Sequence, residues 1–155
     1  MSATPIPRTL ALILYGKTDI SIIDEMPPGR LPVKTFCVPE YKRDDMYVFI
    51  DKEIEKGSQV FVVCPVIEQN ENTDIRSSEE VCELMKKRFD RVALLHGRMN
   101  PSDKNNILSD YRDKKYDILV STTVIEVGID IPDATVMLIE NAERFGLAQL
   151  HQLRG

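Results

Sequence analysis

The chain has 155 residues, of which 43% are hydrophobic and 29% are charged, and 20 basic against 25 acidic residues give a formal net charge of -5. This composition is typical of a soluble globular protein and excludes a wholly basic nucleic-acid coat protein, a disordered chain and a membrane-embedded one. No apolar run approaches the ~20 residues that cross a bilayer, and no export leader is recognisable. We therefore expect a cytoplasmic protein without a membrane partner.

The first 32 residues are expected to be the tail of one lobe followed by a linker. Residues 7–15 predict a short helix and residues 20–24 a short strand, which together are too small to form a core. Pro27, Pro28 and Pro32 then interrupt regular structure. A second lobe is expected over residues 33–155.

From residue 33 onward, short apolar runs alternate with segments of helical periodicity. This pattern predicts the α/β class, with a parallel sheet flanked by helices on both faces. The runs are rich in Val, Ile and Leu without strict alternation, as in strands buried on both faces. The expected strands cover residues 33–38, 60–64, 92–95, 118–121 and 136–140.

Four helices are expected between and after these strands. The first covers residues 41–56 and buries Phe49 with its apolar stripe, and the second opens with a capping box at Ser77 and buries Leu84. The third begins at Asn100 with Pro101 in its first turn, and the last begins near Leu147. Residues 68–76 are polar and are expected to form a surface loop.

The cysteines and histidines do not form a metal-binding pattern. Cys37, Cys64 and Cys82 are far apart and include no Cys-x-x-Cys pair, which argues against a disulfide framework and a zinc site. We expect all three to be core thiols. Only His96 and His151 could supplement them, so we expect no metal bound by this chain.

The chain also lacks a phosphate-binding P-loop. Gly16, Lys17 and Thr18 match the end of that motif, but the residue five positions before Gly16 is Ala11 instead of glycine. We therefore interpret this segment as a turn, and expect the parts that bind and activate ATP to lie outside this chain.

Residues 120–132 contain a stronger candidate site. A buried strand delivers Thr122 and Thr123 at its carboxyl end, where open α/β sheets bind ligands. Both hydroxyls could donate to phosphate oxygens, and Gly128 permits close approach. A strand end whose threonines cap the next turn is an equal alternative on these residues alone.

His96, Gly97 and Arg98 follow the strand at residues 92–95 and are expected at the same sheet edge. They are candidates for contacting a phosphate backbone, although a structural histidine and a solvated arginine are the alternatives. The basic run of Lys86, Lys87, Arg88 and Arg91 is interpreted as an exposed helix face.

Three segments together resemble a superfamily-2 helicase of the RecG type, the ATP-dependent DNA helicases of bacterial fork repair. Residues 1–9 are similar to the third motif of that family, residues 121–132 to the fifth, and residues 151–155 to the beginning of the sixth. The transcription-repair coupling translocase shares several of these strings and is the alternative. Residues 23–30, 63–68 and 95–99 favour the RecG type.

The resemblance implies a RecA-like carboxyl-terminal helicase lobe in a bacterial protein. It implies that ATP and Mg²⁺ are bound mainly by a first motor lobe, and that the partners are branched or forked double-stranded DNA, that first lobe and a DNA-binding wedge domain. Its implied DNA-binding residues are His96, Gly97, Thr122 and Thr123, and Arg98 is added to them from its position next to Gly97. Its implied nucleotide-facing residues are Gly128, Asp130 and Gln152.

The same resemblance places the catalytic arginines of the sixth motif after Gly155, and Arg154 occupies a different position of that motif. No catalytic set is therefore expected to be complete within these residues. We expect the chain alone to be inactive in ATP hydrolysis and unwinding. A lobe that binds DNA or protein without turnover is the alternative function.

Overall fold

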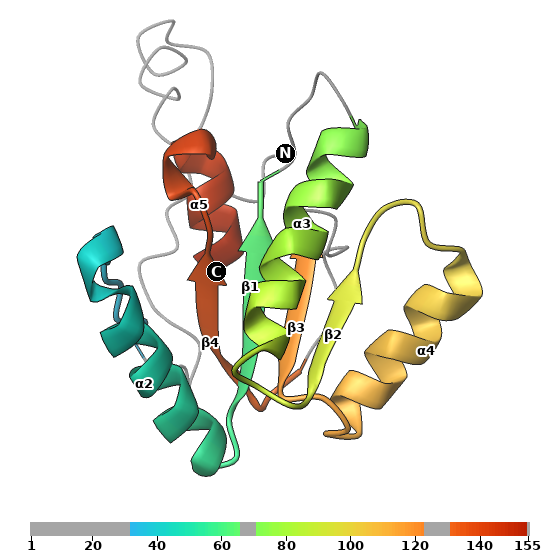
Figure 1. Ribbon diagram of the computed structural model, residues 1–155, viewed down its shortest axis with the longest axis horizontal. Coiled ribbons are helices and arrows are strands. Elements are labelled where there is room, and N and C mark those ends of the chain that lie inside the picture. Colours follow the sequence, from blue (N-terminus) through green and yellow to red (C-terminus); the bar gives the residue numbers. More distant parts are fainter. Residues whose placement is uncertain (1–31, 66–70, 123–130, 155) are drawn as a thin grey trace, which may run out of the picture. The chain divides into compact units, whose positions relative to one another are not determined.

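The computed structural model describes residues 32–65, 71–122 and 131–154 (Figure 1). Residues 38–144 form one compact unit. All strands of the sheet that the structure describes lie in this unit. Residues 32–37 and 145–154 belong to a second unit.

The sheet has four parallel strands in the order β2-β3-β1-β4. The strands are β1 (Gln59–Cys64), β2 (Val92–Leu95), β3 (Ile118–Thr122) and β4 (Ala134–Ile139). The helices are η1 (Glu40–Lys42), α2 (Arg43–Glu55), α3 (Glu71–Lys86), α4 (Pro101–Arg112), η2 (Ala142–Arg144) and α5 (Leu147–Arg154). Because β-branched and apolar residues dominate the central strands β1 and β3, both faces of the sheet can be covered.

Helices do cover both faces of the sheet. The larger core cluster packs α2 and α3 against one face, with Ile50, Cys82 and Met85 against Val62 and Val120. The smaller cluster packs α4 against the other face, and its buried members are Ala93, Leu95, Tyr111, Leu119 and Ile131. The predicted α/β architecture is therefore confirmed.

Local sequence signals fix several ends of these elements. Gly57 follows α2 with φ +90°, a left-handed conformation that glycine adopts at little steric cost. Asn100 caps α4 by accepting a hydrogen bond from the Asp103 amide at 2.8 Å, and Pro101 occupies the first helical position. Buried Gln59 donates to the carbonyls of Tyr111 and Tyr116 at 2.6 and 2.7 Å, which ties the start of β1 to the end of α4.

Two predicted elements differ from the structure by more than two residues at an end. Residues 33–38 form no strand: proline residues flank this short run, Phe36 lies 75% exposed, and none of the described strands pairs with it. The second helix begins at Glu71 and not at Ser77, so part of the predicted loop at 68–76 is helical. Its first turns are polar, and apolar periodicity therefore could not reveal them.

Three predicted core residues are also wrong. Phe49 and Leu84 are 49% and 51% exposed, so the stripes that α2 and α3 bury are narrower than predicted. Cys37 is exposed, whereas Cys64 and Cys82 are buried as expected. The basic run of Lys86, Lys87, Arg88 and Arg91 is exposed as predicted, but it is not a helix face, because only Lys86 lies in α3 and the other three follow its end.

Across residues 32–65, 71–122 and 131–154, no helix is both long and apolar enough to span a membrane. The same residues contain no group of three or more His, Cys, Asp or Glu side chains arranged to hold a metal ion. The helix predicted at 7–15, the strand predicted at 20–24 and the turn at 16–18 lie outside the described residues.

Candidate functional site

The carboxyl ends of the four strands lie at one edge of the sheet, because all the strands are parallel. Leu95 pairs with Ser121, and Cys64 pairs with Thr122. His96 directly follows Leu95 and therefore lies level with Thr122, the residue after Ser121. The structure brings together two of the residue groups that the sequence predicted to share an edge.

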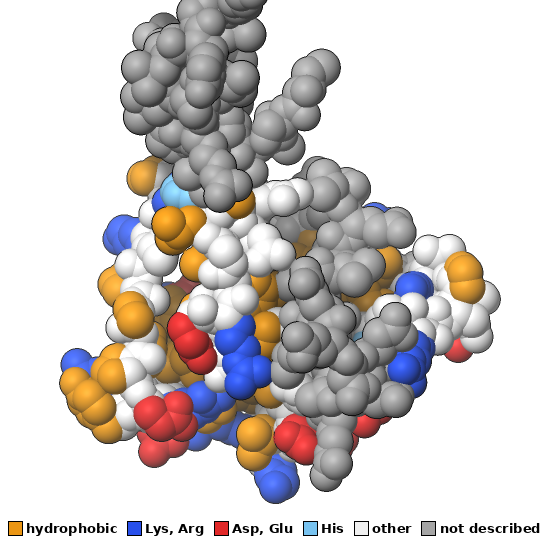
Figure 2. Space-filling view, turned by 90° about the horizontal axis from the view of Figure 1, so that it is seen from above, with side chains coloured by type: hydrophobic (Ala, Val, Ile, Leu, Met, Phe, Trp, Pro, Cys, Tyr) orange, Lys and Arg blue, Asp and Glu red, His pale blue; other side chains and the backbone are white. Residues whose placement is uncertain are grey.

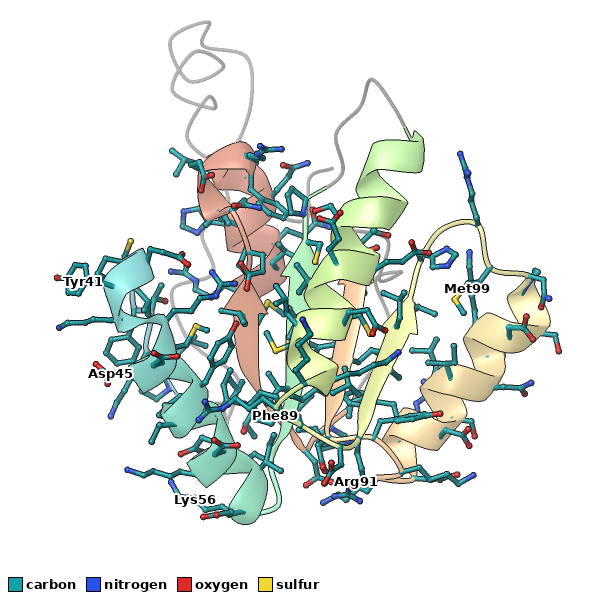
Figure 3. The ribbon with its side chains drawn as sticks, viewed as in Figure 1. Tyr41, Asp45, Lys56, Phe89, Arg91 and Met99 are labelled. Carbon is teal, nitrogen blue, oxygen red and sulfur yellow. The ribbon has the colours of Figure 1, made fainter. Side chains whose placement is uncertain are left out.

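Contacts with the smaller core cluster and with α4 hold the loop between β2 and α4. The Met99 amide donates to the His96 carbonyl at 3.2 Å, and the Met99 side chain packs against the smaller core cluster (Figure 3). Lys104 Nζ donates to the Gly97 carbonyl at 2.8 Å. Side chains of a helix tilt toward its amino terminus, so Lys104 in the first turns of α4 can reach back over the loop. These contacts fix the backbone of residues 96–99 in place.

Gly97 lies in open space on this loop. A Cβ atom added there would meet no described heavy atom within 4 Å, and its φ is not in the left-handed region. The fold itself therefore does not require glycine at this position. Close approach by a ligand backbone is a reason for glycine that fits this geometry.

Ser121 and Thr122 project to opposite faces of the sheet, because successive side chains alternate along a strand. Thr122 follows Val120 toward the α2 and α3 face and is 4% exposed. Ser121 is 1% exposed, and its hydroxyl has no hydrogen-bond partner among the described residues. Ser121 is not among the predicted site residues, although its polarity in a buried apolar strand is a detectable signal.

The polar groups near this edge can bind an anion. Nδ1 of His96 is buried and has no hydrogen-bond partner in the described part of the chain. Arg98 is exposed, and Lys104 forms no ion pair with a described carboxylate. Figure 2 looks down on the end toward which the strands point and shows basic and acidic side chains interspersed over the coloured surface. Arg98 and Lys104 thus supply positive charge beside this edge.

A second polar group lies at the same edge, where β4 ends. The Glu140 side chain is paired with Arg43 from the first turn of α2. Burial, together with the nearby charge of Glu140, raises the pKa of the Cys64 thiol to about 12. Cys64 is therefore a neutral core thiol and not a reactive thiolate.

Two of the nucleotide-facing candidates, Gly128 and Asp130, lie outside the described residues, as does the DNA-binding candidate Thr123. Gln152 is exposed on α5, where a guanidinium nitrogen of Arg154 lies 3.0 Å from Nδ1 of His151. Their roles stay predictions.

The family model described as helicase conserved C-terminal domain matches residues 41–155. The ATP-dependent DNA helicase RecG of Thermotoga maritima is 50% identical over 158 aligned residues, which cover 100% of this chain and 20% of that protein. The ATP-dependent DNA helicase RecG of Synechocystis is 52% identical and is covered to 19% of its length. The chain thus spans about a fifth of the length of these relatives.

The structure of RecG bound to a three-way DNA junction matches 99% of this chain and 20% of that protein chain. The TM-score is 0.74 and the sequence identity is 50%. The match includes the parallel sheet and its edge, because it extends over nearly the whole chain.

Proposed function

Because this chain belongs to the helicase conserved C-terminal domain family, we propose that it is the second motor lobe of an ATP-dependent double-stranded DNA translocase of the RecG type. The fold is that of a RecA-like helicase lobe. The longer protein would remodel stalled forks and branched recombination intermediates, with ATP and Mg²⁺ held mainly by its first lobe and the DNA junction opened by its wedge domain.

The observation that carries the proposal is identity of about half the residues along the entire chain to relatives named RecG. One of the matched structures is bound to a three-way DNA junction. These comparisons favour the RecG type over the transcription-repair coupling translocase. Forked or branched DNA is accordingly the proposed ligand.

Within this lobe, the β2–α4 loop and the end of β3 are the proposed DNA track. His96, the open backbone at Gly97, and Arg98 would contact phosphates from one strand end, and Thr122 with Thr123 from its neighbour. Such contacts carry no base information, which suits a motor that must accept any sequence. With few positive charges at this edge, the lobe alone should bind DNA weakly and in a salt-dependent way.

The nucleotide side of the proposed lobe consists of Gly128, Asp130 and Gln152. When bound, ATP would supply the free energy for the movement of the two lobes. The sequence contains no complete P-loop, and the described residues form no metal-binding group. We propose that these residues sense or orient a nucleotide that another lobe holds.

Fluorescence anisotropy with a labelled forked duplex tests the DNA track at two salt concentrations. The variant Thr122→Ala with His96→Ala should bind at least fivefold more weakly than wild type. Arg98→Ala should lower the slope of log affinity against log salt by ~1, since one phosphate contact is lost. Arg112→Ala, which removes an exposed charge at the other end of α4, is the matched control and should leave the slope unchanged. Equal slopes for the two arginine variants would contradict the assignment of Arg98 to the DNA track.

Turnover separates a motor from a binding module. We expect DNA-stimulated ATP hydrolysis from the longer protein that contains this chain, and none from these 155 residues alone. A longer protein that binds forks without any such turnover would favour the non-catalytic alternative.

A further inference from the structure

An ion pair joins the beginning of α2 to the end of β4. Nη2 of Arg43 lies 2.5 Å from Oε1 of Glu140, a residue 97 positions later in the chain. The Glu140 side chain is only 10% exposed and that of Arg43 is 29% exposed. This pair therefore connects two distant segments in a largely buried setting.

The Arg43 guanidinium is held on all three of its nitrogens. Besides Glu140, it donates from Nε to the Tyr47 hydroxyl at 2.9 Å and from Nη1 to Oε2 of Glu40 at 3.2 Å. Its central carbon also lies 5.8 Å from the centroid of the Tyr47 ring. A planar group fixed at this many points has one orientation, so it holds the carboxylate of Glu140 in one place.

Such a pair is poorly explained by stability alone. Removing two charges from water costs several kcal/mol, and apolar residues of similar size often replace a buried pair without loss of stability. Apolar residues could replace the pair here, because its neighbour at the end of β1 is the buried thiol Cys64. We therefore expect the pair to serve mainly to hold Glu140 in one position.

Glu140 is the point at which the chain leaves the sheet. Its amide still donates to the Val63 carbonyl at 2.9 Å, as a continuation of the β1–β4 pairing. Asn141 then turns the chain with φ 49°, and the Arg144 amide closes a short helical turn on the Asn141 carbonyl at 2.9 Å. Only two residues separate this turn from α5.

We propose that Arg43 and Glu140 form a positioning pair that fixes the departure of the chain from β4, and that the chain leading on to Gln152 depends on this fixed start. This inference rests on the proposed function, in which Gln152 faces ATP. Neither residue touches the DNA track at His96 and Thr122 in this assignment.

The decisive variant replaces both partners, Arg43→Leu with Glu140→Leu, because it removes the pair without leaving one buried charge. In this chain, the variant should unfold near the wild-type temperature. Hydrogen exchange of the segment 140–146 should become at least tenfold faster, while exchange at 92–122 stays unchanged. In the longer protein, KM for ATP should rise at least fivefold, with the dissociation constant for forked DNA within twofold of wild type.

A matched pair at the opposite end of the sheet provides the control. Arg91 donates to both carboxylate oxygens of Asp117, at 2.8 and 2.5 Å, where β3 begins (Figure 3). Arg91→Leu with Asp117→Leu removes an equal charge pair and should leave both the exchange of 140–146 and KM unchanged.

A folded Arg43 and Glu140 double variant with wild-type exchange and wild-type KM would overturn the inference, as would an equal effect of the control. Absence of ATP turnover in the unmodified longer protein would instead refute the proposed function. The exchange measurement in this chain would then still decide whether the pair fixes the segment after β4.

Discussion

Lys104 Nζ donates a hydrogen bond to the backbone carbonyl of Gly97 across 2.8 Å, so the first turns of α4 hold the loop that follows β2. This contact uses one of the three donors of the lysine and leaves its charge beside the proposed DNA track. It connects helix geometry directly to the placement of a candidate binding loop.

Lys104→Met should weaken forked-duplex binding about three- to tenfold, because the loop loses an anchor and the edge loses a positive charge. Thermal unfolding should change little, since a single exposed contact contributes at most ~1 kcal/mol. Lys104→Arg should restore most of the affinity. Lys115→Met is the control for the loss of charge alone. Lys115 lies beyond the end of α4 and is paired with Asp110. Matching losses for the two methionine variants would show that the position of Lys104 is irrelevant.

Two glycines should respond in opposite ways to alanine. Gly97→Ala should keep the wild-type stability, because its methyl group meets open space, but should weaken DNA binding several-fold if a phosphate backbone passes close by. Gly57→Ala should lose about 1 kcal/mol of unfolding free energy, because φ +90° is strained for alanine, and should bind DNA normally. Urea denaturation and anisotropy on the same two variants measure both quantities. Unchanged DNA affinity of Gly97→Ala would remove Gly97 from the track.

Tyr111→Phe should not destabilise the chain. The Tyr111 hydroxyl is buried and has no hydrogen-bond partner among the described residues, and burial raises its pKa. Removing an unsatisfied buried group is expected to leave the unfolding free energy unchanged or to raise it by up to about 1 kcal/mol. The aromatic ring remains to pack against Phe61, whose centroid lies 5.2 Å away. A loss larger than ~1 kcal/mol in urea denaturation would mean that the hydroxyl does have a partner.

The stability of the chain should decrease at alkaline pH because of Cys64. Burial raises the pKa of this thiol from 9.0 to about 12, so the folded state keeps a proton that the unfolded state releases. The contribution of Cys64 to the free energy of unfolding is complete below pH 9 and is lost as the pH rises toward 12. At pH 10.5 this contribution has decreased by about 2 kcal/mol. Urea denaturation at pH 8 and pH 10.5 measures it, and Cys64→Val should show a shallower dependence. Parallel pH curves for the two proteins would contradict this account.

The strands of the sheet could be predicted from the sequence because their signal is local and strong. Residues 60–64 and 118–120 are apolar throughout, and the structure places β1 and β3 within one residue of the predicted ends. The run at 33–38 has similar residues but pairs with none of the strands that the structure describes, so hydrophobicity alone was misleading there. The polar first turns of α3 were missed for the opposite reason, since they carry no apolar stripe.

The candidate site could be predicted only as a location. Parallel strands place His96 and Thr122 at one edge whatever the details, and this geometric rule allowed the grouping. The contact from Lys104 to Gly97 and the pair of Arg43 with Glu140 depend on side-chain reach between elements. No periodicity or motif in the sequence encodes such distances.

The unequal exposure of the three cysteines gives this chain a built-in attachment point. Cys64 and Cys82 are enclosed by the sheet and α3, whereas Cys37 is open to solvent six residues before α2 begins. A maleimide dye should therefore label the folded wild-type chain at a single position, without any engineered cysteine. In the longer protein, a dye at that position would lie shortly before α2, where a change in fluorescence would test the proposed movement between two motor lobes.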